Sequence, residues 1–164
     1  MIDNFVNMGI LVMPLTLAIA WVLALFNVSA PGSAGDGFAI NALAWMFYIP
    51  AGFMFLASGV MHTFFAKKTA ENIGWNTDGF QYELGFVSYG LGLAGILATY
   101  TGSGSWMALS VVISFFLVFA GINHILEMGK NKNFAPGNTL VLLYDFGLPI
   151  SLWALLFAAN LVTF

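Results

Sequence analysis

The chain has 164 residues, of which 60% are hydrophobic and only 7% are charged, and its mean hydropathy is +0.92. A soluble domain carries about 25% charged residues, so this composition excludes a water-soluble globular protein and requires a surface that faces lipid or a partner. The absence of cysteine excludes disulfides, thiolate metal sites and iron–sulfur clusters. A net charge of -3 without a basic run argues against nucleic acid as a partner.

Five apolar stretches are long enough to cross a hydrocarbon core of about 30 Å, which takes about 20 helical residues. In chain order they are Phe5–Asn27, Ala39–Ala66, Glu83–Thr101, Ser105–Met128 and Thr139–Phe164. No internal repeat or low-complexity tract divides the chain. We therefore expect one all-α domain over residues 1–164, an integral membrane bundle of five transmembrane helices.

Turn-forming residues separate these stretches. The segment Ser29–Gly37 is rich in Gly, Ser and Pro and cannot continue a helix. The short segment Gly102–Gly104 predicts an antiparallel hairpin in which the third and fourth helices are neighbours. The last connection ends at Asn138, which we interpret as the N-cap of the fifth helix.

The first stretch has a second interpretation, because Val28–Ala30 resembles the small-residue site at which a signal peptide is cleaved. Signal peptides have a basic start and a shorter apolar core, whereas Met1–Asn4 is acidic and Pro14 lies within the stretch. We therefore expect a retained transmembrane helix.

Four lysines indicate the orientation in the membrane. Lys67 and Lys68 follow the second stretch, and Lys130 and Lys132 follow the fourth. Because the chain changes direction at each crossing, all four lie on one side, and the positive-inside rule makes that side cytoplasmic. This predicts an N-terminus inside and a C-terminus outside.

Small residues recur at helical spacing along the third stretch, a pattern typical of contact faces between membrane helices. One face consists of Gly85, Ser88, Gly92, Gly95 and Thr99. A shorter strip, Gly90 and Ala94, lies on the other side. In the second stretch Pro50 is expected to bend the helix and to free a carbonyl group.

The few ionisable groups of the spans all lie near the predicted cytoplasmic side, on four different helices. They are His62, Glu83, His124, Glu127 and Asp145. Such groups are expensive in a bilayer, so they face the bundle interior, pair with one another or mark a functional path. We expect these five to converge on one polar site, with Gln81, Asn123 and Tyr144 as hydrogen-bonding neighbours.

Four interpretations of this site are open. His–carboxylate hydrogen bonds can tie the helices together, or imidazole nitrogens and carboxylate oxygens can bind zinc, iron or manganese. His124 and Glu127 share a helix face, although their order is the reverse of that in the di-iron bundle motif. His62 and His124 can also serve as the axial ligands of a b-type haem. The fourth interpretation is a pathway for protons or a solute.

A non-enzymatic alternative is an accessory subunit of a larger membrane complex or a homo-oligomer. The short connections leave little room for a soluble substrate site, and the small-residue faces of the third stretch can pack against foreign helices. No phosphate-binding glycine loop precedes a helix, and no nucleophile elbow is found. The sequence therefore assigns no enzymatic activity.

Two segments, Gly74–Gly85 and Asn133–Asn138, contain a Gly-Trp loop, a Phe-Gln-x-Glu-x-Gly helix start and the run Asn-Phe-Ala-Pro-Gly-Asn. Together they resemble a group of small multi-pass bacterial membrane proteins classed as a domain of unknown function. The resemblance extends roughly from His62 to Asp145. It implies a helical bundle in a bacterial or archaeal inner membrane and supplies no activity. In that group a Gln often stands at the position of Glu127, which argues against Glu127 as an obligatory ligand.

Overall fold

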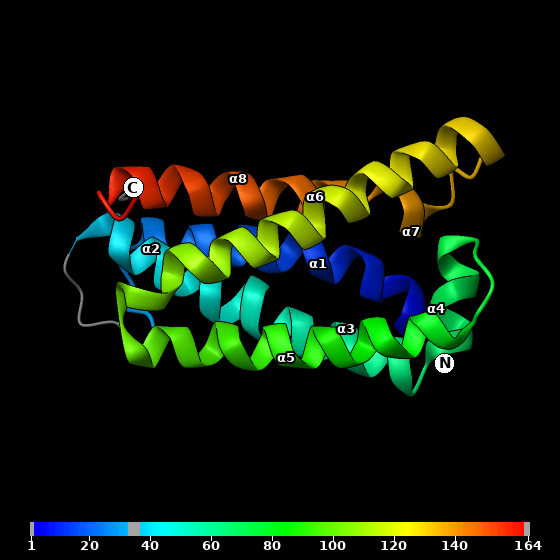
Figure 1. Cartoon of the computed structure of the whole chain (residues 1–164), viewed down its shortest axis with the longest axis horizontal. Coiled ribbons are helices and arrows are strands. Elements are labelled where there is room, and N and C mark those ends of the chain that lie inside the picture. Colours follow the sequence, from blue (N-terminus) through cyan, green and yellow to red (C-terminus); the bar gives the residue numbers. More distant parts are fainter. Residues whose placement is uncertain (1, 33–36, 163–164) are drawn as a thin grey trace.

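The computed structural model describes residues 2–32 and 37–162, and these residues form only helices and their connections. The long helices run along a common direction (Figure 1). In chain order the helices are α1 Ile2–Leu25, α2 Phe38–Met46, α3 Met54–Thr63, α4 Ala66–Ile73, α5 Gly79–Thr101, α6 Trp106–Asn131, α7 Pro136–Thr139 and α8 Leu142–Ala158.

Four helical segments are long and apolar enough to cross a membrane. They are Phe38–Thr63, Gly79–Thr101, Ser103–Asn131 and Pro136–Ala158. α1 adds a further long helix, whose residues Leu11–Leu25 are apolar. The predicted all-α membrane bundle is thus confirmed. The predicted fifth stretch extends too far, because α8 ends at Ala158, and residues 163–164 of that stretch lie outside the described residues.

The turn after α1 is held against α2. The carbonyl oxygen of Val28 accepts hydrogen bonds from Asn41 Nδ2 and Trp45 Nε1, both at 2.8 Å. Farther back in α1, Trp21 Nε1 donates to Ser151 Oγ of α8 at 3.0 Å. α1 therefore packs as a member of the bundle. Of the predicted loop Ser29–Gly37, residues 33–36 lie outside the described residues.

The predicted small-residue face of α5 is confirmed, because all five of its residues are buried. This face packs against α3 and the π-helical segment Phe47–Phe53 that joins α2 to α3. A Cβ atom at Gly92 would lie 2.7 Å from the backbone nitrogen of Leu56 and 2.8 Å from the carbonyl oxygen of Gly52. By contrast, a Cβ atom at Gly90 would have no neighbour within 4 Å.

We expect Gly92→Ala to lower the free energy of unfolding by about 1–2 kcal/mol, because the added methyl group would push two backbones apart. Thermal unfolding of the detergent-solubilised protein, followed by tryptophan fluorescence, measures this change. Gly90→Ala is the matched control on the same helix and is expected to unfold at or above the temperature of the unmodified protein. Equal losses for both variants would contradict the packing argument.

Pro50 lies inside the π-helical segment, as expected for a proline that disturbs the hydrogen-bond ladder. Its carbonyl oxygen accepts a buried hydrogen bond of 2.6 Å from the Tyr144 hydroxyl of α8. This bond ties the last helix to the second span.

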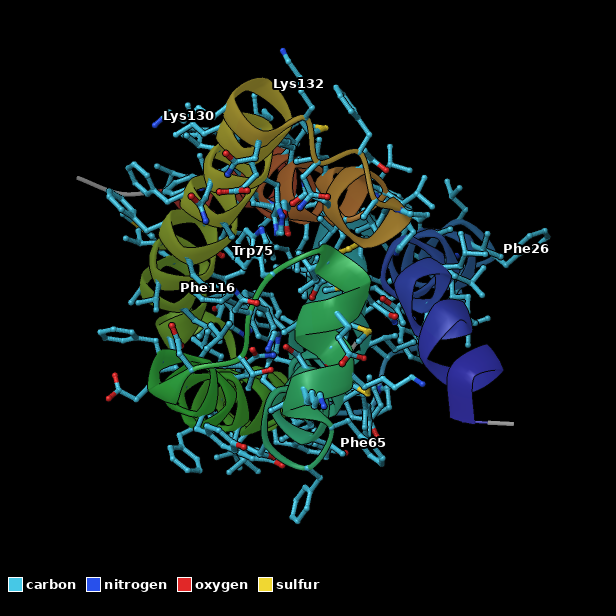
Figure 2. All side chains as sticks on the ribbon, turned by 90° about the vertical axis from the view of Figure 1, so that its right-hand side faces the viewer. Phe26, Phe65, Trp75, Phe116, Lys130 and Lys132 are labelled. Carbon is cyan, nitrogen blue, oxygen red and sulfur yellow. The ribbon has the colours of Figure 1, made fainter. Side chains whose placement is uncertain are left out.

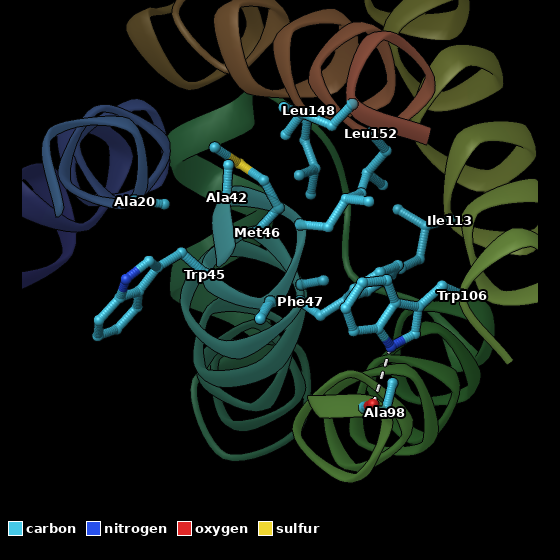
Figure 3. Packing of buried hydrophobic residues seen from close by; sticks show 14 of the residues in the cluster. Ala20, Ala42, Trp45, Met46, Phe47, Ala98, Trp106, Ile113, Leu148 and Leu152 are labelled. Atoms are coloured by element: carbon cyan, nitrogen blue, oxygen red, sulfur yellow. Dashed lines mark hydrogen bonds between the residues drawn. The ribbon is translucent and has the colours of Figure 1, made fainter. Parts of the chain in front are cut away.

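The α5–α6 hairpin is confirmed at its turn but not along its length. Near the turn, Trp106 Nε1 donates to the Ala98 carbonyl oxygen at 2.8 Å (Figure 3). Away from it the two helices separate, and α5 packs mainly against α3 whereas α6 packs mainly against α8 (Figure 1). The prediction of neighbouring helices assumed only a short turn, and the glycine face of α5 selects α3 instead.

A core of fully buried side chains lies toward the end of the bundle that carries this turn. Side chains from α2, the π-helical segment, α6 and α8 meet there (Figure 3). Five side chains of this core are fully buried, at 0% exposure: Met46, Phe47, Ile113, Leu148 and Leu152. The opposite end is built differently, with α4, α7 and the start of α1 (Figure 1).

α4 was not predicted, because its polar sequence lies outside the apolar stretches. It carries Lys67 and Lys68, and Thr69 Oγ1 anchors it by donating to the Met61 carbonyl oxygen at 3.0 Å. Lys130 and Lys132 lie at the same end of the molecule (Figure 2). We call this the lysine end.

Candidate functional site

A cavity of about 560 Å³ lies inside the bundle near the lysine end. Its wall is mostly apolar and is formed by residues of α1, α3, α4, α5, α6 and α8, with Phe55, Leu84 and Phe116 among them. This volume falls within the range of about 300–1,000 Å³ that is typical of small-molecule sites. Three of the five predicted site residues line the cavity, namely His62, His124 and Asp145.

His124 is buried on α6 and is oriented by Asn138. The amide nitrogen of Asn138 donates to the carbonyl oxygens of His124 at 3.1 Å and Asn133 at 2.8 Å. The amide oxygen of Asn138 therefore accepts from His124 Nδ1, at 2.6 Å. A neutral imidazole that carries its proton on Nδ1 has a free lone pair on Nε2.

Trp75 covers His124. The indole belongs to the Gly74–Asp78 segment between α4 and α5 and stacks on the imidazole, with ring centroids 5.2 Å apart and planes inclined by 16°. Figure 2 shows Trp75 between α4 and α6 at the lysine end. The indole nitrogen is buried and has no hydrogen-bond partner.

His62 has the opposite arrangement. Gln81 Nε2 donates to the Ala66 carbonyl oxygen at 2.8 Å and lies 3.3 Å from His62 Nδ1. Because an amide nitrogen only donates, His62 Nδ1 is the acceptor, and a neutral His62 carries its proton on Nε2. The two imidazoles at the cavity are thus different tautomers.

Asp145 lies on α8 and is only 2% exposed. Its Oδ2 atom has no hydrogen-bond partner. Two further buried donors without a partner, Trp75 Nε1 and Asn72 Nδ2, belong to other residues of the cavity wall. The fourth such atom in the described part of the chain is Ser110 Oγ, whose residue does not line the cavity.

The other two predicted residues lie elsewhere. Glu83 is exposed on α5, because Gln81, two positions earlier, turns toward the interior instead. Glu127 accepts a hydrogen bond of 2.8 Å from Asn131 and lines a separate polar pocket with Asn76 and Asn123. The structure therefore brings three of the five residues together and places two outside.

The residues can be tested against the metal and haem interpretations. In the described part of the chain, no group of three or more His, Cys, Asp and Glu side chains is placed to hold a metal ion. His124 has the arrangement of a ligating imidazole, with Nδ1–H bonded to an acceptor and Nε2 free. His62 does not, since its Nδ1 accepts from Gln81. An axial pair for haem would require His62 to carry its proton on Nδ1, which Gln81 Nε2 as placed cannot accept.

Three residues of this site were missed or misread from the sequence. The interpretation of Asn138 as the N-cap of the last helix is wrong: Val141 occupies that position in α8 and Ala135 in α7, and the Asn138 side chain is buried against His124. Trp75 and Asn72 were not assigned to the site. For Trp75 and Asn138, the available signal was their position in the two motif segments.

The comparisons with known proteins give one family and no activity. A family model described as a family of unknown function, DUF6790, matches residues 10–162. No curated protein and no solved structure matches the chain.

Proposed function

Since the chain belongs to the DUF6790 family, whose description gives no activity, we propose a function from the cavity: this membrane protein binds a small amphiphilic molecule inside its helical bundle. The hydrophobic part of the ligand would contact the apolar wall. Its polar group would lie near Asp145, Asn72 and Trp75.

The unpartnered polar atoms carry this proposal. A buried donor or acceptor without a hydrogen bond costs about 1–3 kcal/mol, and such atoms are rare in folded proteins. Here one acceptor, Asp145 Oδ2, and two donors, Asn72 Nδ2 and Trp75 Nε1, belong to residues of the same cavity. These atoms are closed off from the empty cavity, so a ligand would offset this cost once the three side chains turn toward it, whereas a purely structural cavity would have to bear it.

The same cavity supports the metal interpretation only through His124 and Asp145, and it supports the haem interpretation less, because His62 faces Gln81 as an acceptor. The structural support for a role in a larger complex is the strip at Gly90, where a Cβ atom would have no neighbour within 4 Å and a foreign helix could pack. For the location we propose a bacterial or archaeal inner membrane, as the family resemblance implies. The positive-inside rule places the lysine end in the cytoplasm.

The test uses 1-aminoanthracene, a small aromatic probe whose fluorescence rises in apolar surroundings. We expect saturable binding to the purified full chain in detergent. Ala120 on α6 lines the cavity, and Ala120→Phe is expected to weaken binding by about tenfold or more, equivalent to about 1.4 kcal/mol per factor of ten.

The matched control is Ala108→Phe, because Ala108 is exposed on the same helix and does not line the cavity. This variant should bind the probe as the unmodified protein does. Equal binding by both variants and the unmodified protein would place the probe outside the cavity and refute the proposal.

A further inference from the structure

The described cavity wall carries one carboxyl group, and its basic side chains are the imidazoles of His62 and His124. Asp145 is the single acidic residue among the described residues that line the cavity, and neither Lys nor Arg is among them. Burial of an ionised carboxylate in apolar surroundings is expensive unless a cation or hydrogen-bond donors compensate it. The described wall supplies neither Lys nor Arg for this purpose, and His62, whose Nδ1 accepts a hydrogen bond from Gln81, is neutral.

Two donors of the cavity wall are already engaged. The Tyr144 hydroxyl, next to Asp145 in the chain, donates to the Pro50 carbonyl oxygen. The Nδ1–H group of His124 donates to Asn138. The donors of the wall that remain without a partner, Asn72 Nδ2 and Trp75 Nε1, do not bond to Asp145 Oδ2, so a ligand can supply its partner.

Aromatic rings form a large part of the same wall. Phe55 packs against Phe116 and Tyr144, with ring centroids 5.7 Å and 6.4 Å apart, and Trp75 contributes its indole. The face of an aromatic ring attracts a cation within about 6 Å of its centroid, by about 2 kcal/mol or more when both are desolvated. A wall that holds a carboxylate and several aromatic rings favours an organic cation over a neutral amphiphile.

We propose that the ligand of this cavity is a hydrophobic organic cation, whose positive group is held by the Asp145 carboxylate and by the aromatic rings of Phe55, Phe116 and Trp75. This inference rests on the proposed function and narrows it to one ligand class. The charge is complementary, because the described wall holds one acidic side chain and neither Lys nor Arg.

The experiment measures the binding of two cations of different size to the purified full chain in detergent, by equilibrium dialysis. The cations are tetraphenylphosphonium and benzyltrimethylammonium. We expect at least one cation to bind saturably and to displace 1-aminoanthracene. Asp145→Asn keeps the size of the side chain but removes its charge, and it should weaken cation binding by about tenfold or more while 1-aminoanthracene still binds.

Glu83→Gln is the matched control, because it removes a carboxylate that is exposed on α5 outside the cavity. It should leave cation binding unchanged. Binding of neither cation, or equal cation binding by Asp145→Asn and the unmodified protein, would overturn the inference. If 1-aminoanthracene still bound in a manner sensitive to Ala120→Phe, the proposed function would stand without the cation, and loss of that signal too would remove both.

Discussion

Replacement of Asn138 by Ala is expected to lower the free energy of unfolding by about 3–4 kcal/mol. The side chain is 0% exposed and makes three hydrogen bonds, to His124 Nδ1, the His124 carbonyl oxygen and the Asn133 carbonyl oxygen. Truncation leaves these buried groups without their partner, and the cost of each is larger than the net value of an ordinary hydrogen bond. Thermal unfolding followed by tryptophan fluorescence measures the loss.

Asn138→Asp separates hydrogen bonding from volume. It keeps the acceptor that faces His124 but replaces the donor with a second oxygen directed at two carbonyl groups, so it should destabilise at least as much as Asn138→Ala. Asn76→Ala, at an exposed position of the same end, is the control and should change stability little. An unfolding temperature of Asn138→Ala equal to that of the control would contradict this role for Asn138.

The membrane bundle could be predicted from the sequence because the relevant signals are local. Twenty apolar residues in a row identify a span wherever it packs, and the periodic small residues of α5 identify its contact face. The choice of packing partner is not local. The Gly102–Gly104 turn indicated α6 as the neighbour of α5, whereas the close approach of Gly92 to Gly52 and Leu56 selects α3.

The candidate site could be predicted only in part, since depth along a helix follows from position in the chain but rotation about the helix axis does not. His62, His124 and Asp145 face the cavity, whereas Glu83, at a similar predicted depth, is exposed. Residues that are two positions apart on a helix point to nearly opposite sides. Gln81 therefore faces inward, where Glu83 was expected.

The two motif segments meet in space, which the sequence did not reveal. Asn133 Nδ2 donates to the Ile73 carbonyl oxygen at 2.8 Å, and a Cβ atom at Gly74 would lie 2.7 Å from the Asn133 side chain. The next residue, Trp75, stacks on His124, which Asn138 holds. The Gly-Trp loop and the Asn-Phe-Ala-Pro-Gly-Asn run thus form one network over the cavity, and the residues of both motifs act on His124.

The second large effect is expected at Asp145, where a substitution should stabilise the ligand-free protein. Its Oδ2 atom is buried without a hydrogen bond, so Asp145→Leu, which removes the polar group, is expected to raise the free energy of unfolding by about 2–3 kcal/mol. For a chain of this length, this raises the midpoint of thermal unfolding by roughly 4–12 °C. Natural sequences retain such a cost where the residue serves a function.

Ser110→Ala provides the comparison, because Ser110 Oγ is also buried without a partner but does not belong to the cavity wall. It should stabilise the protein by a smaller amount, since a hydroxyl group is less expensive to bury than a carboxylate, and it should not affect probe binding. Asp145→Leu should instead combine higher stability with the loss of cation binding. A fall in stability on Asp145→Leu would mean that the carboxyl group holds the helices together, as the structural interpretation of the His–carboxylate cluster requires, and would argue against a site built for a ligand.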